Sequence, residues 1–365
     1  MCFNGYMVEE KMNKNRLLGL DVIKTIAMLF VIAIHIPLYR YDFVSDHSIG
    51  VFVQYALRMI SKGVPLFFAV NGFLLLRRNE LSIDRHCRTM LKIFLLLVFW
   101  GLFLILINLL YDGTPINRSL IIDLFLKTKG GSLYTGELWF LQALFAVYAI
   151  YPFLWLSLHK ERKLYFVLFG LLLCFACIDE FLNITTSVLN NQIHIEHLNH
   201  LNLFIGRLKL IDAYEWDVLY FMSGGLVSLY SEEIQKRKML FTVIWFVVWL
   251  SFFFLSIYIS TKKNQLFVQF IDNSSILQLI SIFFVFSICL GLKNTGAAGK
   301  LFSQIGSNTF GIYVTHQFFI RISRLLIPQD LFVERFLIML MALAFSFFFT
   351  KIMRRIPYLK HLFEL

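Results

Sequence analysis

The sequence predicts an all-α integral membrane protein, a bundle of about ten transmembrane helices with both termini in the cytoplasm. Of its 365 residues, 58% are apolar and 16% are charged, against roughly 25% charged residues in an ordinary soluble domain. The mean hydropathy is +0.71. A soluble domain of this composition would have too few polar groups to cover its surface. A disordered chain would be richer in charge and poorer in aromatic residues.

Apolar runs of about 20 residues, the length that crosses a bilayer, recur along the whole chain. They are Leu17–Tyr39, Val51–Leu76, Leu91–Tyr111, Leu138–Leu158, Leu164–Leu182, Trp216–Tyr230, Leu240–Ser260, Ser274–Leu292, Leu301–Ile327 and Leu331–Thr350. The second run is interrupted at Gly63-Val64-Pro65, and a helix broken by proline inside a bundle often lines a cavity. No linker or repeat divides the chain. We therefore expect a short arm at 1–16, one membrane domain at 17–357 and a short tail at 358–365.

The basic residues predict the orientation of these helices. With a cytoplasmic N-terminus, the inside segments carry 20 of the 34 Lys and Arg residues, and the outside segments carry nine although they include the two longest loops. The net charge of +11 thus reflects topology, and we expect no binding to nucleic acid. The two long loops, 112–137 and 183–215, are expected outside the cell.

Ionisable residues within the first run are the strongest functional signal, because charges inside a membrane are costly. This run contains Asp21, Lys24 and His35. At about 100° per residue, Lys24 and His35 lie within about 20° of the same helix face and roughly 16 Å apart along the axis. A buried neutral imidazole can act as a general base near neutral pH. The alternative is that Asp21 and Lys24 reach the membrane interface and His35 only bonds a neighbouring helix.

Other polar residues in the runs extend this set. Asn71 follows the Pro-broken segment, and Tyr313 and His316 share a helix face with Thr309. A basic cluster precedes the third run and consists of Arg77, Arg78, Arg85, Arg88 and Lys92. Such a cluster suits the phosphates of a nucleotide or coenzyme, although it is also explained by the topology rule alone.

The segment HIEHLNH in the second long loop is the main metal-like pattern in the chain. Its histidines are His194, His197 and His200. Steps of three residues spread imidazoles around a helix, so we expect a polar rim or a substrate contact here and predict no metal site.

Several segments together resemble the acyltransferase 3 family of multi-pass enzymes that modify cell-surface sugars. RLLGLDVIKTIAMLFVIAIH resembles the family's first-helix signature, in which many relatives have Arg at the position of Lys24. VPLFFAVNGFLL contains Asn71, RHCRTMLKI supplies Arg85, Arg88 and Lys92, and ELWFLQALFAVYAIYPFL contains Trp139. FMSGGLVSLY and IGSNTFGIYVTH resemble later signatures, and the second supplies Tyr313 and His316. The resemblance runs from about 16 to 357.

This resemblance implies transfer of an acyl group, often acetyl, from cytoplasmic acyl-CoA to a hydroxyl of an extracytoplasmic glycan. It implies that His35 is the essential base, or briefly an acyl carrier, and that Arg85, Arg88 and Lys92 hold the coenzyme phosphates. Asp21 and Lys24 would organise the cytoplasmic half of the channel. Asn71, Trp139, Tyr313 and His316 are candidates for substrate contact or oxyanion stabilisation. We expect the cell membrane as the location and no tightly bound cofactor, with acyl-CoA as a substrate.

The main alternative is a multi-pass transporter or export subunit for a polysaccharide or small solute. Such a protein also uses intramembrane charges and broken helices. A purely structural membrane subunit would leave His35 unexplained. The sequence leaves open the acceptor sugar, the choice between acetyl and other acyl groups, and the oligomeric state.

Overall fold

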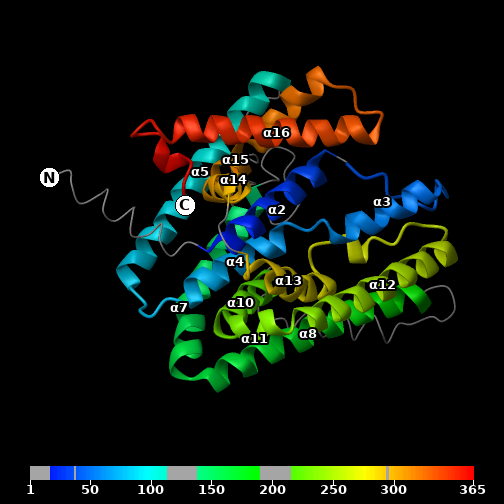
Figure 1. Cartoon of the computed structure of the whole chain (residues 1–365), viewed down its shortest axis with the longest axis horizontal. Coiled ribbons are helices and arrows are strands. Elements are labelled where there is room, and N and C mark those ends of the chain that lie inside the picture. The colour runs from blue at the N-terminus through cyan, green and yellow to red at the C-terminus, as the bar shows by residue number, and fades with distance from the viewer. Residues whose placement is uncertain (1–16, 37, 113–137, 190–214, 293–295) are drawn as a thin grey trace.

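The computed structural model describes residues 17–36, 38–112, 138–189, 215–292 and 296–365, and within these ranges every regular element is a helix (Figure 1). The all-α prediction is therefore confirmed for this part of the chain. The elements are α2 Leu18–His35, α3 Ile49–Ile60, α4 Val64–Leu76, α5 Ile83–Asp112, α7 Trp139–Lys160, α8 Arg162–Leu189, α10 Glu215–Leu229, α11 Ser231–Lys236, α12 Lys238–Lys263, η2 Gln269–Ile271, α13 Ile276–Cys289, α14 Gly296–Ser307, α15 Thr309–Leu326, α16 Phe332–Met353 and η3 Lys360–Leu362.

Eight helical segments among the described residues are long and apolar enough to cross a membrane. They correspond to eight of the ten expected runs. The run expected at Trp216–Tyr230 forms α10, whose 15 residues rise only about 22 Å. Every residue of α10 from Glu215 to Val227 is buried, so this short helix lies inside the bundle.

The run expected at Leu301–Ile327 is divided into α14 and α15 at Asn308. The polar side chains at this point bond backwards to backbone carbonyls, a pattern that competes with the regular helix ladder. Ser307 Oγ donates to Ser303 O at 2.9 Å, and Asn308 Nδ2 donates to Gln304 O at 2.7 Å. The described residues thus confirm eight candidate spans and do not confirm ten.

The predicted break in the second run is confirmed. α3 ends at Ile60 and α4 begins at Val64, with Pro65 in the first turn, where its missing N–H is not needed. Gly63 packs directly on α2, because a Cβ atom there would collide with the carbonyl oxygen of Ala27. The break therefore seats the start of α4 against the first helix.

Two glycines let α4 and α10 pack backbone against backbone at the centre of the bundle. A Cβ atom at Gly72 would meet the carbonyl oxygen of Phe221, and one at Gly224 would meet that of Ala69. Small residues at helix contacts permit this close approach within membranes. The close contact with α10 therefore fixes the position of α4 and of the side chains it carries.

α2 also lies at the centre and contacts α4, α13, α14, α15 and α16. In Figure 1, α16 runs along one edge and α8 and α12 along the opposite edge. α12 lies at the periphery, with only 6% of its apolar span buried within the protein. An outer face this apolar is typical of contact with lipid.

Candidate active site

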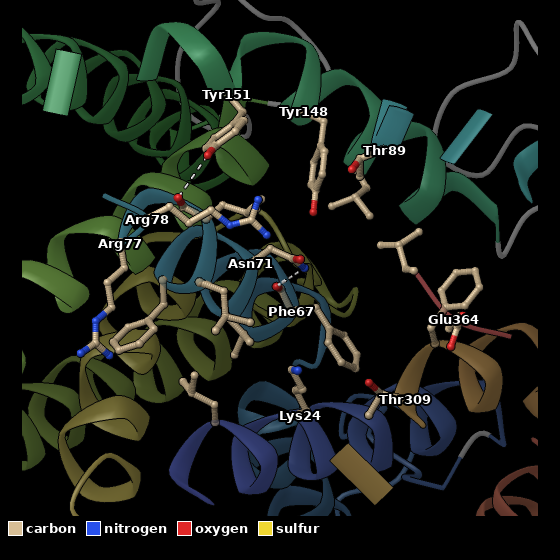
Figure 2. Close-up of a pocket in the computed structure, with 18 of the residues that line it drawn as sticks. Lys24, Phe67, Asn71, Arg77, Arg78, Thr89, Tyr148, Tyr151, Thr309 and Glu364 are labelled. Carbon is tan, nitrogen blue, oxygen red and sulfur yellow. Dashed lines mark hydrogen bonds between the residues drawn. The ribbon is translucent and has the colours of Figure 1, made fainter. Parts of the chain in front are cut away.

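A large cavity, here called the basic cavity, opens beside the first turns of α2. Its volume is about 1460 Å³, enough for a ligand of nucleotide size or larger. The walls come from α2, α4, the start of α5, α7, the junction of α14 and α15, and the last residues of the chain. Figure 2 shows Lys24, Asn71, Tyr148 and Thr309 arranged around one open space.

Positive charge predominates in the basic cavity. Its cationic side chains are Lys24, Arg77, Arg78, Arg85, Lys92 and Arg354, and its acidic ones are Asp21, Glu80 and Glu364. Arginine guanidinium groups bind phosphate oxygens in pairs of parallel hydrogen bonds, and lysine adds point charge. The lining therefore suits a polyanionic ligand.

The first turns of α2 place Asp21 and Lys24 on the cavity wall. Asp21 is only 2% exposed, and its Oδ2 accepts a hydrogen bond from Ser303 Oγ at 3.0 Å. Gly306 allows α14 to reach this carboxylate, since a Cβ atom there would collide with the Asp21 side chain. Asp21 thus joins α2 to α14, and the half-buried Lys24 points into the cavity (Figure 2).

The end of α4 and the loop after it are held against α7 by two hydrogen bonds to backbone carbonyls. Trp155 Nε1 donates to Arg78 O at 2.8 Å, and Tyr151 Oη donates to Leu75 O at 3.2 Å (Figure 2). Because these bonds use backbone carbonyls, the guanidinium groups of Arg77 and Arg78 stay available at the cavity. Arg77 also lies over the Phe73 ring at 5.7 Å.

The opposite rim is formed by Arg354 and the end of the chain. Arg354 Nη1 donates to Ser307 O at 2.9 Å and to Asn308 Oδ1 at 2.7 Å, and Nη2 lies 3.4 Å from Glu364 Oε2. Trp100 Nε1 donates to Leu362 O at 3.0 Å, and the ring of Trp100 packs on Phe363. These contacts fix the junction of α14 and α15 at the cavity.

His35 lies at the other end of α2, and its ring packs against His316. The two ring centres are 5.2 Å apart. The ring of His316 is also 5.8 Å from that of Tyr313, which lines the basic cavity. Tyr313 therefore stands between the cavity and the two histidines, and the order of contacts is cavity, Tyr313, His316 and His35.

The hydrogen bond at His316 defines its tautomer. Nδ1 faces the carbonyl oxygen of Tyr313, which only accepts hydrogen bonds, so Nδ1 carries the proton in the neutral ring. Nε2 then has a free lone pair, and it is buried without a hydrogen-bond partner among the described residues. His316 is 1% exposed, so this Nε2 lone pair is a buried hydrogen-bond acceptor beside His35.

The residues singled out from the sequence occupy different places. Those lining the basic cavity are Asp21, Lys24, Asn71, Arg77, Arg78, Arg85, Lys92 and Tyr313. The residues His35, His316, Arg88 and Trp139 are not part of its lining. Arg88 is exposed on α5, and Trp139 is half-buried at the start of α7. The loop histidines His194, His197 and His200 lie outside the described residues, as does most of both long loops.

Sequence reasoning missed Arg354, Thr309 and Tyr148 as cavity residues. Arg354 belongs to a basic run that the topology rule already explains, so no residual signal distinguished it. Thr309 was visible in the four-then-three spacing with Tyr313 and His316, and that spacing was the available clue.

Comparison with known families identifies the family to which the chain belongs. The model of the acyltransferase 3 family, described as an acyltransferase domain, matches residues 17–351. The chain belongs to the acyltransferase 3 family. No curated protein and no solved structure matches it.

For this acyltransferase 3 protein, the matched region runs from α2 almost to the end of α16, so it contains both ends of α2 and most of the basic cavity. The chain is a membrane acyltransferase by family and by its apolar helices. The boundaries expected at 16/17 and 357/358 stay predictions. The last residues nevertheless contribute Phe363, Glu364 and Leu365 to the cavity wall.

Proposed function

We propose that this protein is a membrane O-acyltransferase that moves an acyl group, acetyl in the simplest case, from cytoplasmic acyl-CoA to a hydroxyl of a cell-surface or exported glycan. One observation carries the proposal. A basic cavity at one end of α2 leads through Tyr313 to a pair of packed histidines at the other end. The family match favours this proposal over a transporter for a polysaccharide or solute.

The donor would bind in the basic cavity. Its phosphates would lie on Arg85 and Lys92, with Arg77 and Arg78 completing the cationic rim. Arg88, which is exposed beside them, would add charge at the entrance. Lys24 and Asp21 would organise the wall that the pantetheine arm passes. The cavity volume of about 1460 Å³ is large enough for a whole acyl-CoA molecule.

The reaction needs one general base and hydrogen-bond donors that stabilise the oxyanion. His35 takes the proton of the acceptor hydroxyl while its oxygen forms a bond to the thioester carbonyl carbon. The carbon–sulfur bond then breaks, and the departing thiolate receives the proton from His35. The products are the glycan ester and CoA thiol, and the histidine is neutral again. In the route through an acyl carrier, His35 itself holds the acyl group before the hydroxyl attacks.

Neighbouring side chains would assist this step. Asn71 donates one amide hydrogen to Phe67 O at 2.9 Å and keeps a second for an oxyanion, and Tyr313 offers a phenol hydroxyl. His316, whose Nδ1 bonds Tyr313 O, would contact the substrate or His35 through Nε2. Trp139, the first residue of α7, would contact the substrate.

The proposed setting is the cell membrane with both termini in the cytoplasm, so that the basic cavity faces the donor. The long outer loops would then meet the acceptor. The reaction requires acyl-CoA as a substrate and no tightly bound cofactor.

The test combines binding and transfer in the purified full chain. Acetyl-CoA is expected to raise the melting temperature of the wild type and of His35→Ala equally, because the donor binds at the other end of α2. Release of CoA in the presence of acceptor glycan is expected from the wild type and lost in His35→Ala. Normal O-acetylation by that variant would refute the catalytic assignment.

A further inference from the structure

The end of α2 that carries His35 is surrounded by cations from two other helices. Arg58 lies in the last turn of α3, and Arg324 lies in the last turn of α15. Arg324 Nη2 donates to the carbonyl oxygen of His35 at 2.8 Å. The charges of both arginines act on the His35 ring. We call the four residues His35, His316, Arg58 and Arg324 the histidine end.

Both arginines keep buried hydrogen-bond donors that the described residues do not use. Arg58 Nη1 and Arg324 Nε are each buried without a hydrogen-bond partner in the part of the chain that the structure describes. A charged donor left unpaired away from water costs free energy, so such groups normally have a partner. The bond from Arg324 to His35 O and the contact of Arg58 with the Tyr41 ring at 5.9 Å leave these two nitrogens unexplained.

The local charge balance is positive. Lys62, 3% exposed, lies one turn beyond Arg58, with its ammonium on the carbonyl oxygen of Ile271. Asp272 is the acid whose charge acts on Arg58 and on Lys62. Among the described residues, this one carboxylate does not neutralise Arg58, Lys62 and Arg324, and Asp42 and Asp46 line the adjoining cavity instead. An additional anion would therefore be stabilised at the two arginines.

A second cavity adjoins this cluster. Its volume is about 430 Å³, and its lining includes Tyr41, Asp42 and Asp46. Tyr41 is shared with Arg58, since the guanidinium lies over its ring. Asp42 and Asp46 each accept hydrogen bonds from nearby backbone N–H groups, and their remaining oxygen lone pairs can accept from sugar hydroxyls. The volume suits one or two sugar rings.

We propose that Arg58 and Arg324 bind an anionic oxygen group of the acceptor, a sugar carboxylate or a phosphate, while the adjoining sugar lies in the cavity beside Tyr41. The acceptor is thus an acidic glycan, and the anion holds its hydroxyl at His35. Two guanidinium groups provide the paired donors that such oxygens accept. This inference rests on the proposed function for the meaning of the acceptor, but anion binding is measured without any transfer.

The experiment compares two disaccharides that differ in one group, cellobiose and cellobiouronic acid. Binding is measured by calorimetry on the full chain in phosphatidylcholine nanodiscs without acyl-CoA. We expect binding of cellobiouronic acid and at least tenfold weaker binding of cellobiose. Arg58→Gln and Arg324→Gln are each expected to weaken cellobiouronic acid binding by about 10- to 100-fold.

Control variants show whether a loss of binding is specific to Arg58 and Arg324. Arg237→Gln removes an exposed arginine between α11 and α12 and is expected to bind like the wild type. Arg58→Lys and Arg324→Lys retain the charge without the planar fork, so partial recovery is expected and serves if a glutamine variant fails to fold. Acetyl-CoA stabilisation, at the far end of α2, reports that each variant is folded.

Each remaining outcome bears on the proposal. Binding of glucose 6-phosphate that depends on both arginines supports it and assigns the anion as phosphate. Equal binding of cellobiouronic acid by wild type and glutamine variants overturns it. Arginine-dependent stabilisation by phosphatidylglycerol nanodiscs alone, without sugar binding, also overturns it and assigns a lipid site. Arginine-dependent sugar binding without ester formation from any acceptor supports the site and refutes the proposed function.

Discussion

The two ends of α2 belong to one helix but have opposite surroundings. The basic cavity is wide, at about 1460 Å³, and its cations are set around open space. At the histidine end the rings are packed at 5.2 Å, and His316 is 1% exposed. Binding a large polyanion requires room and charge, whereas proton transfer benefits from exclusion of water. Under the proposed function, this difference would place recognition of the donor at one end and chemistry at the other.

The largest expected effect separates the two ends. His35→Ala is expected to lower the rate of ester formation by about 10²- to 10⁴-fold, the range for loss of a general base. Acetyl-CoA binding, measured by thermal shift, is expected to be unchanged because the histidine does not line the basic cavity. His159→Ala, at the exposed end of α7, is the control and is expected to retain full activity. A parallel loss of donor binding in His35→Ala would contradict the division.

The residue between the two ends gives the next largest effect. Tyr313→Phe removes the phenol hydroxyl but keeps the ring that packs on Phe140 and His316. We expect kcat to fall by about 10²-fold, as on removal of one oxyanion donor, with the KM for acetyl-CoA little changed. Steady-state kinetics of CoA release measures both values. An increase in KM alone would make Tyr313 a binding residue only.

The basic cavity is tested by removing its phosphate-binding charges. The double variant Arg85→Gln with Lys92→Gln is expected to raise the Kd for acetyl-CoA by about 10- to 100-fold, and added salt should weaken wild-type binding in the same direction. Arg88→Gln is the matched comparison, because Arg88 is exposed and outside the lining. Its expected change is several-fold at most. Equal effects for the two variants would show that charge near the entrance, and not the cavity wall, binds the donor.

The smallest effect is expected at the rim. Arg354 and Glu364 are each about one-third exposed, at 29% and 32%, and ion pairs of this kind contribute ~0–1 kcal/mol. Glu364→Gln is therefore expected to change the melting temperature little and to lower the Kd for acetyl-CoA a few-fold by removing an acid from the cavity. Calorimetry with acetyl-CoA measures this. Weaker donor binding in Glu364→Gln would contradict the electrostatic account.

Much of the fold is readable from local sequence, because apolar length and the Gly63-Val64-Pro65 break are local properties. The division at Asn308 is harder to read, since it depends on short polar side chains bonding back to carbonyls within an apolar stretch. The helical spacing correctly placed Lys24 and His35 on one helix, but it contained no information on their neighbours. The bond from Arg324 to His35 joins residues 289 positions apart, and no single-sequence pattern reports such a contact.

The same limit applies to predicting the candidate site from the sequence. Asp21, Lys24, Arg85 and Lys92 were found because charge near a membrane is conspicuous. Arg58 and Arg324 were equally visible as charges, yet their convergence on His35 follows from the tertiary fold, which brings the ends of α3 and α15 to the end of α2. Arg354 was hidden because basic residues at a cytoplasmic end already have a sufficient explanation in topology.

Thr309, Tyr313 and His316 lie on successive turns of α15, and Arg324 follows about two turns later. Thr309 and Tyr313 line the basic cavity, His316 packs on His35, and Arg324 donates to the carbonyl oxygen of His35. One helix therefore supplies side chains to both ends of α2. A substitution that changes the position of α15 would alter the wall of the basic cavity and the contacts of His35 together.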